Sequence, residues 1–343
     1  MVDAVSEVRR HASAWIVLAL LGAAGFTLVA GVAAADGGDV PTRLLGASPF
    51  AREVSIEAMS VSGAATLSLR RDGVGVATRT VDVEGARVRF DGVAVPSRAA
   101  TFTVAALSSE GDVIDESAPL PVVETDFLPC PPVVGLADRA VVGSSPVVRG
   151  VQCSATTTIV ALVNGAPVAT QSVRPVRGPF AVQLTGLPYQ ASTLRVRATN
   201  VWGSSDSAPY TVWNLGVTLP RATYIVVDKS ECRLYMVRNS LFVKRYSISI
   251  GTPRTPTPSG EFVITKKRRN TPPKQSGLGA YWLRLEKITS GGRLKFSGYF
   301  IHGTSWKRAI GMAASLGCVD MLDKEILKFG PTVAVGTHVL IRE

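Results

Sequence analysis

Short runs of alternating hydrophobic and polar positions dominate the chain from about residue 40 to residue 215. Examples of these runs are ATLSLRR, ATFTVAAL, TTTIVALV and STLRVRAT, all rich in Val, Thr and Leu. Each run is bounded by Gly, Asp, Asn or Pro, the residues that commonly make turns. Alternation with a period of two is typical of strands that bury one face. The pattern therefore predicts that this part of the chain is all β.

An internal repeat divides this β region into two parts. The segment VATRTVDVEGARVRFDGV is matched by VATQSVRPVRGPFAVQLTGL, so that Thr78 corresponds to Thr170, 92 positions later. A period of about 90 residues with several short strands has the size of an immunoglobulin-like sandwich. We predict two tandem Ig-like β-sandwiches, at 40–125 and 130–215, joined by LPCPPVV. They serve either as a spacer or as a module that binds a glycan or a protein.

Export from the cell is predicted by the N-terminal segment, residues 1–35. Arg9 and Arg10 precede a long apolar stretch, and Ala33 and Ala35 are spaced like a signal-peptide cleavage site. The apolar stretch also approaches the ~17–25 residues that span a bilayer. The segment is thus either a signal peptide or an N-terminal membrane anchor, and we expect the rest of the chain in the periplasm or the cell wall.

Charge is distributed unevenly along the chain. From residue 220 to the end there are 21 Lys and Arg against 8 Asp and Glu, a net charge of +13, whereas the chain before Lys229 contains no lysine. This asymmetry predicts a separate C-terminal domain at 220–343. A basic domain attracts polyanions, and for an exported protein we expect anionic cell-envelope polymers rather than nucleic acid as partners. A basic surface that serves only solubility is the alternative.

The four cysteines fall into two pairs. Cys130 and Cys153 lie in the second sandwich, and export favours a disulfide between them. Cys232 and Cys318 lie in the C-terminal domain. A second disulfide there would make Cys318 structural, whereas a free Cys318 could be a nucleophile.

Cys318 stands in SLGC, a setting that favours nucleophilic chemistry. A thiol with a pKa of about 8.5 needs help to form the thiolate, and an imidazole usually provides it. His302, in GYFIHGTS, ends an apolar strand, whereas His338 alternates within the terminal strand VGTHVLI. Gly317 would let a substrate carbonyl approach backbone N–H groups that form an oxyanion hole. The Cys and His spacings match no common zinc site, so we expect no metal.

The C-terminal domain resembles the L,D-transpeptidase catalytic domain, also called the YkuD family, from about Tyr224 to Ile341. The resemblance rests on motifs in a specific order: YIVVDKSECRLYMVRNSLFVKRYSISIG, TPTPSGEFVITKK, IHGT, SLGCVDM and VGTHVLI. It implies a β-rich catalytic fold with the cysteine near the end of a groove. The predicted fold class is therefore mainly β, with two sandwiches followed by this catalytic domain.

The resemblance also implies roles for individual residues. Cys318 would be the nucleophile, and His302 would activate it and handle protons of the leaving and attacking amines. The Gly303 carbonyl would orient the imidazole, as a carboxylate does in other triads. Ser315 would support the loop by hydrogen bonding, and Gly317 matches the motif glycine.

Three further residues belong to the expected site. Tyr281 and Trp282 match a region that lines the groove in the family. Asp320 is a departure, because many members carry Arg or Asn two residues after the cysteine. A carboxylate there would raise the pKa of the Cys318 thiol if it pointed inward. It would also change how the stem peptide's carboxylate is recognised.

The implied reaction is acyl transfer between peptidoglycan stem peptides without a cofactor. The thiolate attacks the carbonyl of a diamino acid, expels the terminal D-alanine, and a neighbouring stem's amine resolves the thioester to give a 3→3 cross-link. Two alternatives keep this chemistry but use water, as in a carboxypeptidase, or a protein amine, as in a wall-anchoring transferase. A third is a non-catalytic wall-binding module in which Cys318 is disulfide-bonded to Cys232.

Overall fold

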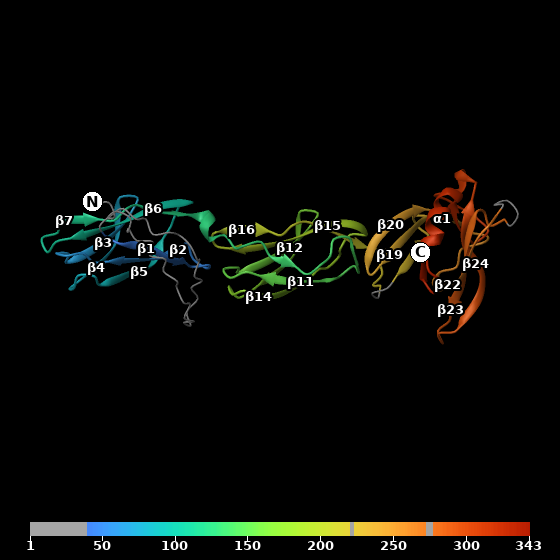
Figure 1. Cartoon of the computed structure of the whole chain (residues 1–343), viewed down its shortest axis with the longest axis horizontal. Helices are drawn as coiled ribbons and strands as arrows, with labels where there is room; N and C mark the ends of the chain where they lie inside the picture. Colours follow the sequence, from blue (N-terminus) through green and yellow to red (C-terminus); the bar gives the residue numbers. More distant parts are fainter. Residues whose placement is uncertain (1–39, 220–222, 272–276) are drawn as a thin grey trace, which may run out of the picture.

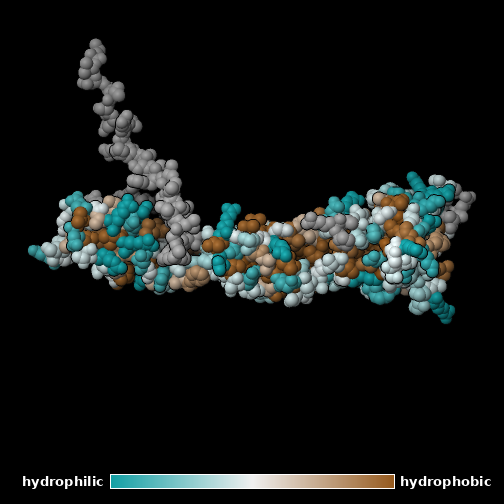
Figure 2. Space-filling model, turned by 90° about the horizontal axis from the view of Figure 1, so that it is seen from below, coloured by the Kyte–Doolittle hydropathy of each residue, from teal (hydrophilic) through white to brown (hydrophobic). Residues whose placement is uncertain are grey.

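The computed structural model describes residues 40–219, 223–271 and 277–343. In these residues the chain forms an elongated rod with three successive bodies, and Figures 1 and 2 agree on this shape. Each body has a hydrophobic core of its own, and a smaller cluster lies between the second and third bodies. Strands far outnumber helices, which confirms the prediction of a mainly β chain.

The first body is built from two sheets that share one core. One sheet has the order β1-β2-β5, with β1 (Thr42–Ala47), β2 (Glu53–Met59) and β5 (Arg87–Ala94). The other has the order β4-β3-β6-β7, with β8 paired to β6, and comprises β3 (Thr66–Arg71), β4 (Val74–Thr80), β6 (Ala99–Leu107), β7 (Val113–Glu116) and β8 (Leu120–Val123). Ile56 and Leu69 show how the alternating pattern turns one face of each sheet into the core. The immunoglobulin-like type of this sandwich stays a prediction.

The second body also has two sheets around a core. The smaller has the order β14-β11-β9, with β9 (Val133–Val134), β11 (Val147–Gln152) and β14 (Gly178–Gln183). The strands of the larger sheet are β10 (Ala140–Val142), β12 (Thr158–Val163), β13 (Ala166–Ser172), β15 (Gln190–Asn200), β16 (Gly203–Asp206) and β17 (Tyr210–Asn214). The predicted disulfide between Cys130 and Cys153 is present, with 6.0 Å between its Cα atoms.

A tryptophan of the second body packs into the hydrophobic core of the first body. Trp202 is 1% exposed and belongs to the hydrophobic core of the first body, where its ring lies 4.9 Å from that of Phe127 in the short helix η1 (Glu124–Phe127). Its Nε1–H donates to the Ser48 carbonyl at 2.6 Å, and the Arg52 guanidinium lies over its ring. A buried aromatic with a satisfied polar atom makes a specific contact, so the first two bodies meet in a packed interface.

The third body continues the larger sheet of the second. The full order is β13-β12-β15-β17-β10-β20-β19-β18-β27-β22-β23-β24-β26. The added strands are β18 (Tyr224–Asp228), β19 (Arg233–Arg238), β20 (Leu241–Ser247), β22 (Gly260–Arg269), β23 (Tyr281–Ile288), β24 (Leu294–Thr304), β26 (Val319–Leu322) and β27 (His338–Arg342). The remaining elements are β21 (Ile250–Gly251), β25 (Ala313–Ser315), α1 (Asp323–Phe329), η3 (Lys307–Ala309) and η4 (Gly330–Thr332).

A buried carboxylate joins the second and third bodies. Asp228, fully buried at the end of β18, accepts hydrogen bonds from Tyr189 of the second body and from Arg342 and Ser230 of the third. Nearby, the ring of Trp213 stacks on that of Phe242 at 3.7 Å. The third body is therefore joined to the second by polar and aromatic contacts as well as by the continuous sheet.

The predicted export segment, residues 1–35, lies outside the described residues. Within the three described ranges, the structure contains no helix that is long and apolar enough to cross a membrane.

Candidate active site

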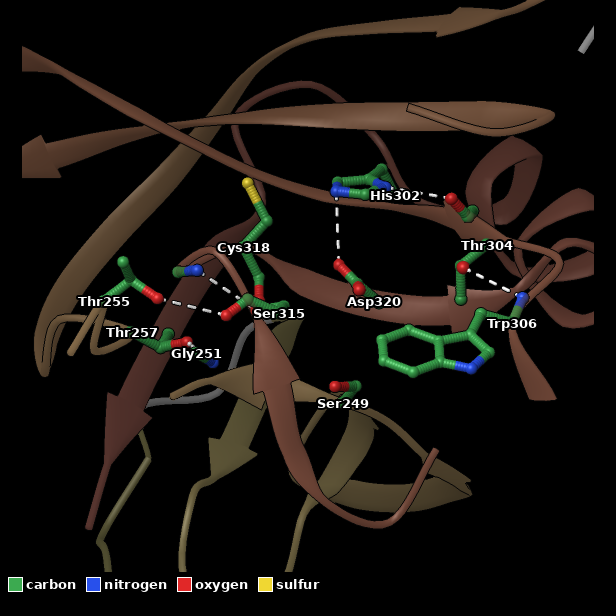
Figure 3. Close-up of polar contacts among 12 residues, drawn as sticks. Ser249, Gly251, Thr255, Thr257, His302, Thr304, Trp306, Ser315, Cys318 and Asp320 are labelled. Carbon is green, nitrogen blue, oxygen red and sulfur yellow. Dashed lines mark hydrogen bonds and ion pairs between the residues drawn. The ribbon is translucent and has the colours of Figure 1, made fainter. Parts of the chain in front are cut away.

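The candidate site lies where β24 and β26 run side by side near one end of the long sheet. The two strands are parallel, and their register places His302 opposite Asp320. Cys318 immediately precedes β26, two residues before Asp320, so that both side chains emerge on the same face as His302. Figure 3 shows the three side chains together, with the Nε2 edge of the imidazole toward Cys318 and Asp320. The topology thus brings together the cysteine and histidine that the motifs predicted.

The orientation of His302 is set by its own neighbour in the chain. Its Nδ1 atom lies 2.9 Å from the carbonyl oxygen of Gly303. A carbonyl only accepts hydrogen bonds, so Nδ1 carries a proton and Nε2 is the nitrogen left for chemistry. A side chain at position 303 would not fit, because a Cβ there would lie 2.1 Å from Oδ1 of Asp323 and 2.9 Å from the Ala280 nitrogen. Gly303 is needed for this close packing.

Asp320 is a buried acid beside the imidazole. Its Oδ1 atom lies 3.2 Å from Nε2 of His302, yet Oδ1 receives no well-aligned hydrogen bond. The contact is close enough for an ion pair, but its direction is poor for N–H donation. Burial raises the pKa of Asp320, although the charge of His302 acts in the opposite direction. Two backbone hydrogen bonds with Ser249, both 2.9 Å, hold the Asp320 main chain in place.

Cys318 is unpaired and half-buried. Burial raises the pKa of its thiol above the ordinary value, a hydrogen bond from the Phe300 backbone lowers it, and the negative charge of Asp320 raises it again. The net direction is upward, so the neutral thiol is favoured in the resting site. The nearby imidazole is thus needed to take the thiol proton when the nucleophile is used.

The loop before Cys318 is held by hydrogen bonds and close backbone contacts. The Ser315 hydroxyl accepts from Gly317 N–H at 3.1 Å and donates to the Cys318 carbonyl at 2.7 Å. The Thr255 hydroxyl donates to the Ser315 carbonyl at 3.2 Å. Gly317 has φ 113°, and a Cβ there would lie 2.8 Å from the Tyr299 ring. Because Ser315 uses the Gly317 N–H, an oxyanion hole in this loop would depend on the remaining N–H groups.

Tyr281 and Trp282 lie on opposite faces of β23, which differs from the expectation that both line the groove. Tyr281 is buried in the core of the third body, where its ring packs against Gly330. Trp282 is the cross-strand neighbour of His302, and its ring meets that of Phe300 edge to face at 5.6 Å. Successive strand residues point to opposite faces, so only Trp282 shares a face with His302.

Three exposed apolar residues that follow the histidine motif were not among the predicted site residues. Trp306, Met312 and Leu316 are all more than half exposed, and Leu316 reaches 87%. In Figure 3 the Trp306 ring lies beyond Asp320 on the side away from Cys318. Exposed large apolar groups beside a reactive side chain are suited to contact a ligand. The sequence feature that could have indicated these residues is the concentration of apolar residues in a glycine-containing loop.

Cys232 and Cys318 do not form a second disulfide, because both are free. Within the described residues there is no group of three or more His, Cys, Asp and Glu side chains that could hold a metal ion. Cys232 is a buried, free cysteine whose sulfur lies 3.7 Å from the Lys229 carbonyl oxygen. His338 lies in β27 against the Tyr224 ring. The arrangement of thiol, imidazole and orienting carbonyl is suited to acyl transfer through a thioester.

Comparison with known proteins identifies the family of the C-terminal part of the chain. Residues 222–341 match the family model of the L,D-transpeptidase catalytic domain. YqjB of Bacillus subtilis (strain 168), a protein assigned to the L,D-transpeptidases, is 31% identical over 142 residues, which are 38% of this chain and 78% of YqjB. YkuD of the same organism is 36% identical over 118 residues, which cover 34% of this chain and 65% of YkuD.

Solved L,D-transpeptidase structures are similar to this chain at a lower sequence identity. An L,D-transpeptidase from Mycobacterium smegmatis is 14% identical, covers 62% of this chain and 100% of its own, and has a TM-score of 0.29. L,D-transpeptidase 3 from Mycobacterium tuberculosis is 18% identical, and the match covers 63% of this chain and 99% of the Mycobacterium tuberculosis chain, with a TM-score of 0.28. These values say nothing about substrate. The family model and the match to most of YqjB, together with the site geometry, show that this chain belongs to the L,D-transpeptidase family.

Proposed function

We propose that the protein forms 3→3 cross-links between peptidoglycan stem peptides through a thioester on Cys318. The observation that carries this proposal is that the Cys318 side chain lies beside the Nε2 edge of His302 (Figure 3), while the Gly303 carbonyl engages Nδ1 and leaves Nε2 as the nitrogen that transfers protons. Family membership supports the substrate class, the peptide stems of peptidoglycan.

The first half of the reaction is acylation of the cysteine. Nε2 of His302 accepts the thiol proton, and the sulfur attacks the carbonyl of the third stem residue, a diamino acid. The new C–S bond forms as the bond to the terminal D-alanine breaks, and the imidazolium returns its proton to the departing amine. General acid and base catalysis of this kind contributes about 10²–10⁴-fold to a rate. The Gly303 carbonyl keeps the imidazole in the required tautomer throughout.

The second half is attack on the thioester by the side-chain amine of a neighbouring stem. His302 accepts a proton from that amine, the C–N bond forms, and the sulfur leaves as the thiol. Because the chemistry uses only protons and acyl groups, no cofactor takes part in the proposed cycle. The basic charge of the C-terminal domain suits an anionic cell-wall surface.

The proposal is tested by incubating the purified protein with tetrapeptide-containing peptidoglycan fragments and analysing the products by mass spectrometry. Cross-linking predicts dimers joined between two third residues, with release of D-alanine. Tripeptides without dimers would identify a carboxypeptidase instead, and attachment of a protein amine would identify an anchoring transferase. A Cys318→Ala sample shows which products depend on the thiol.

A further inference from the structure

Every proton that His302 transfers must pass through one nitrogen. Nδ1 is engaged by the Gly303 carbonyl at 2.9 Å, which leaves Nε2 as the exchangeable position. The Asp320 carboxyl lies 3.2 Å from that same nitrogen. Any group that gives a proton to Nε2 must therefore come close to the Asp320 carboxyl as well.

Asp320 is held where it can act on such a group. It is 8% exposed, and its backbone is fixed by the paired hydrogen bonds to Ser249. Among the described residues, the ion pairs of Asp320 are confined to His302. Its Oδ1 atom is buried without a well-aligned hydrogen bond, although buried polar atoms usually have one. The site thus contains an acid whose hydrogen-bonding capacity is only partly used by the protein.

We propose that Asp320 selects a protonated amine, rather than water, as the acceptor that resolves the Cys318 thioester. The inference rests on the proposed function and specifies the acceptor. An amine nitrogen within hydrogen-bond reach of Nε2 lies no more than about 6 Å from Oδ1, since proton transfer requires about 3 Å between heavy atoms. Opposite charges interact substantially over that range. An ammonium group is stabilised there, whereas water gains no such charge interaction.

The step balances without any further reactant. The bound ammonium gives one proton to the Asp320 carboxylate, and its freed electron pair attacks the thioester carbonyl. The C–N bond forms, the C–S bond breaks, and the C–S electron pair goes to the sulfur. The second amine proton passes through Nε2 to the sulfur and restores the thiol. The first proton is then released to solvent.

Asp320 affects the two halves of the reaction in opposite directions. Before acylation its negative charge opposes the Cys318 thiolate. Once the thioester has formed, the sulfur carries no charge, and the carboxylate acts only on the incoming acceptor. An Asp at this position therefore slows nucleophile formation but favours capture of an amine.

The test measures how the acyl-enzyme partitions between transfer and hydrolysis. A synthetic tetrapeptide serves as donor, and two acceptor peptides are compared: one with a side-chain ammonium, and an analogue with an aminooxy group, which is uncharged at neutral pH. For Asp320→Asn we expect the ratio of transfer to hydrolysis to fall at least tenfold with the ammonium acceptor and less than twofold with the aminooxy acceptor. Asp320→Glu should restore part of the ratio.

Equal losses with both acceptors would overturn the inference, because a merely structural role does not distinguish charge. An unchanged ratio with the ammonium acceptor would overturn it too. The wild-type protein provides a second measurement that does not depend on the variant's folding: half-maximal transfer should require at least tenfold less ammonium acceptor than aminooxy acceptor. Similar requirements would contradict the inference while leaving cross-linking intact. A wild-type protein that forms a thioester but transfers to neither acceptor would overturn the proposed function as well.

Discussion

The Nδ1 atom of His302 lies 2.9 Å from the carbonyl oxygen of Gly303, so a backbone group takes the orienting role that a carboxylate has in other triads. A carbonyl does not titrate, and the imidazole keeps this partner at every pH at which the fold survives. Cys318 and Asp320, whose pKa values are both raised by burial, are therefore expected to contribute to the pH dependence of the site.

Replacing Gly303 by Ala should reduce the rate of Cys318 acylation at least tenfold. The new Cβ would lie 2.1 Å from Asp323 Oδ1, so the backbone must shift and carry the orienting carbonyl with it. Gly291→Ala is the matched control, because its Cβ meets nothing within 4 Å. The measurement is the acylation rate by mass spectrometry, with the melting temperature recorded for both variants. A fully active Gly303→Ala protein would show that this carbonyl is dispensable.

Cys318→Ala should abolish turnover and leave the melting temperature nearly unchanged. The thiol is free and half-buried, so its removal breaks no covalent link and leaves only a small change in packing. Product analysis and a thermal melt check the two parts of this expectation. A large loss of stability would instead point to a structural role for the thiol.

The other free cysteine provides the control for Cys318. Cys232 is buried in the core of the third body, and burial raises the pKa of its thiol. Cys232→Ser should therefore retain most of the activity, because the residue lies among core side chains rather than with His302. If Cys232→Ser were as inactive as Cys318→Ala, the two cysteines would be coupled and the assignment of the nucleophile would be wrong.

The mainly β fold could be predicted because the alternation of hydrophobic and polar positions is a local signal. Two features of the site were also local: Cys318 and Asp320 are two residues apart and share a face, and Gly303 follows His302 directly. The pairing of Cys318 with His302 is of longer range. It was predicted from the motifs, because the spacing of the two residues alone does not determine it.

The remaining features depend on tertiary contacts. Whether Tyr281 or Trp282 faces His302 is decided by strand register, and a shift of one residue would exchange them. The insertion of Trp202 into the neighbouring core likewise needs two bodies to meet. Nothing in the local pattern around Asp228 shows that its partners come from both sides of a domain junction.

A carbapenem should acylate Cys318, since its strained ring carbonyl is open to attack by a thiolate. Intact-mass spectrometry should show a single adduct, and peptide mapping should place it on Cys318. His302→Ala should slow adduct formation by about 10²–10⁴-fold, the usual cost of losing a general base. An adduct on Cys232, or the absence of any adduct on a protein that turns over substrate, would count against this site.

Asp320→Asn should shift the pH profile of Cys318 alkylation to lower pH. Burial raises the pKa of this thiol, and the Asp320 charge raises it further. Removing that charge makes the thiolate form at lower pH, so alkylation near pH 7 should become faster. Iodoacetamide labelling of the wild-type and variant proteins over a range of pH measures the effect. Overlapping profiles would show that Asp320 does not influence the nucleophile.

Asp228→Asn should destabilise the protein by about 3 kcal/mol at pH 7, because it leaves the Arg342 guanidinium without its buried counter-ion. Burial opposes ionisation of Asp228, but hydrogen bonds from Ser230, Tyr189 and Arg342 outweigh it and lower its pKa. A carboxylate whose pKa is lower in the folded state stabilises the fold above its unfolded pKa of about 3.9. That contribution is lost as the pH falls through the folded value. Urea unfolding should therefore show a large difference in the free energy of unfolding between wild type and Asp228→Asn at pH 7. This difference should decrease as the pH drops below about 4.

The control is the same change in the more exposed Arg197–Asp206 pair. Asp206→Asn should lower the free energy of unfolding by no more than about 1 kcal/mol. Equal losses of unfolding free energy at both positions would mean that the buried network around Asp228 does not stabilise the junction between the second and third bodies.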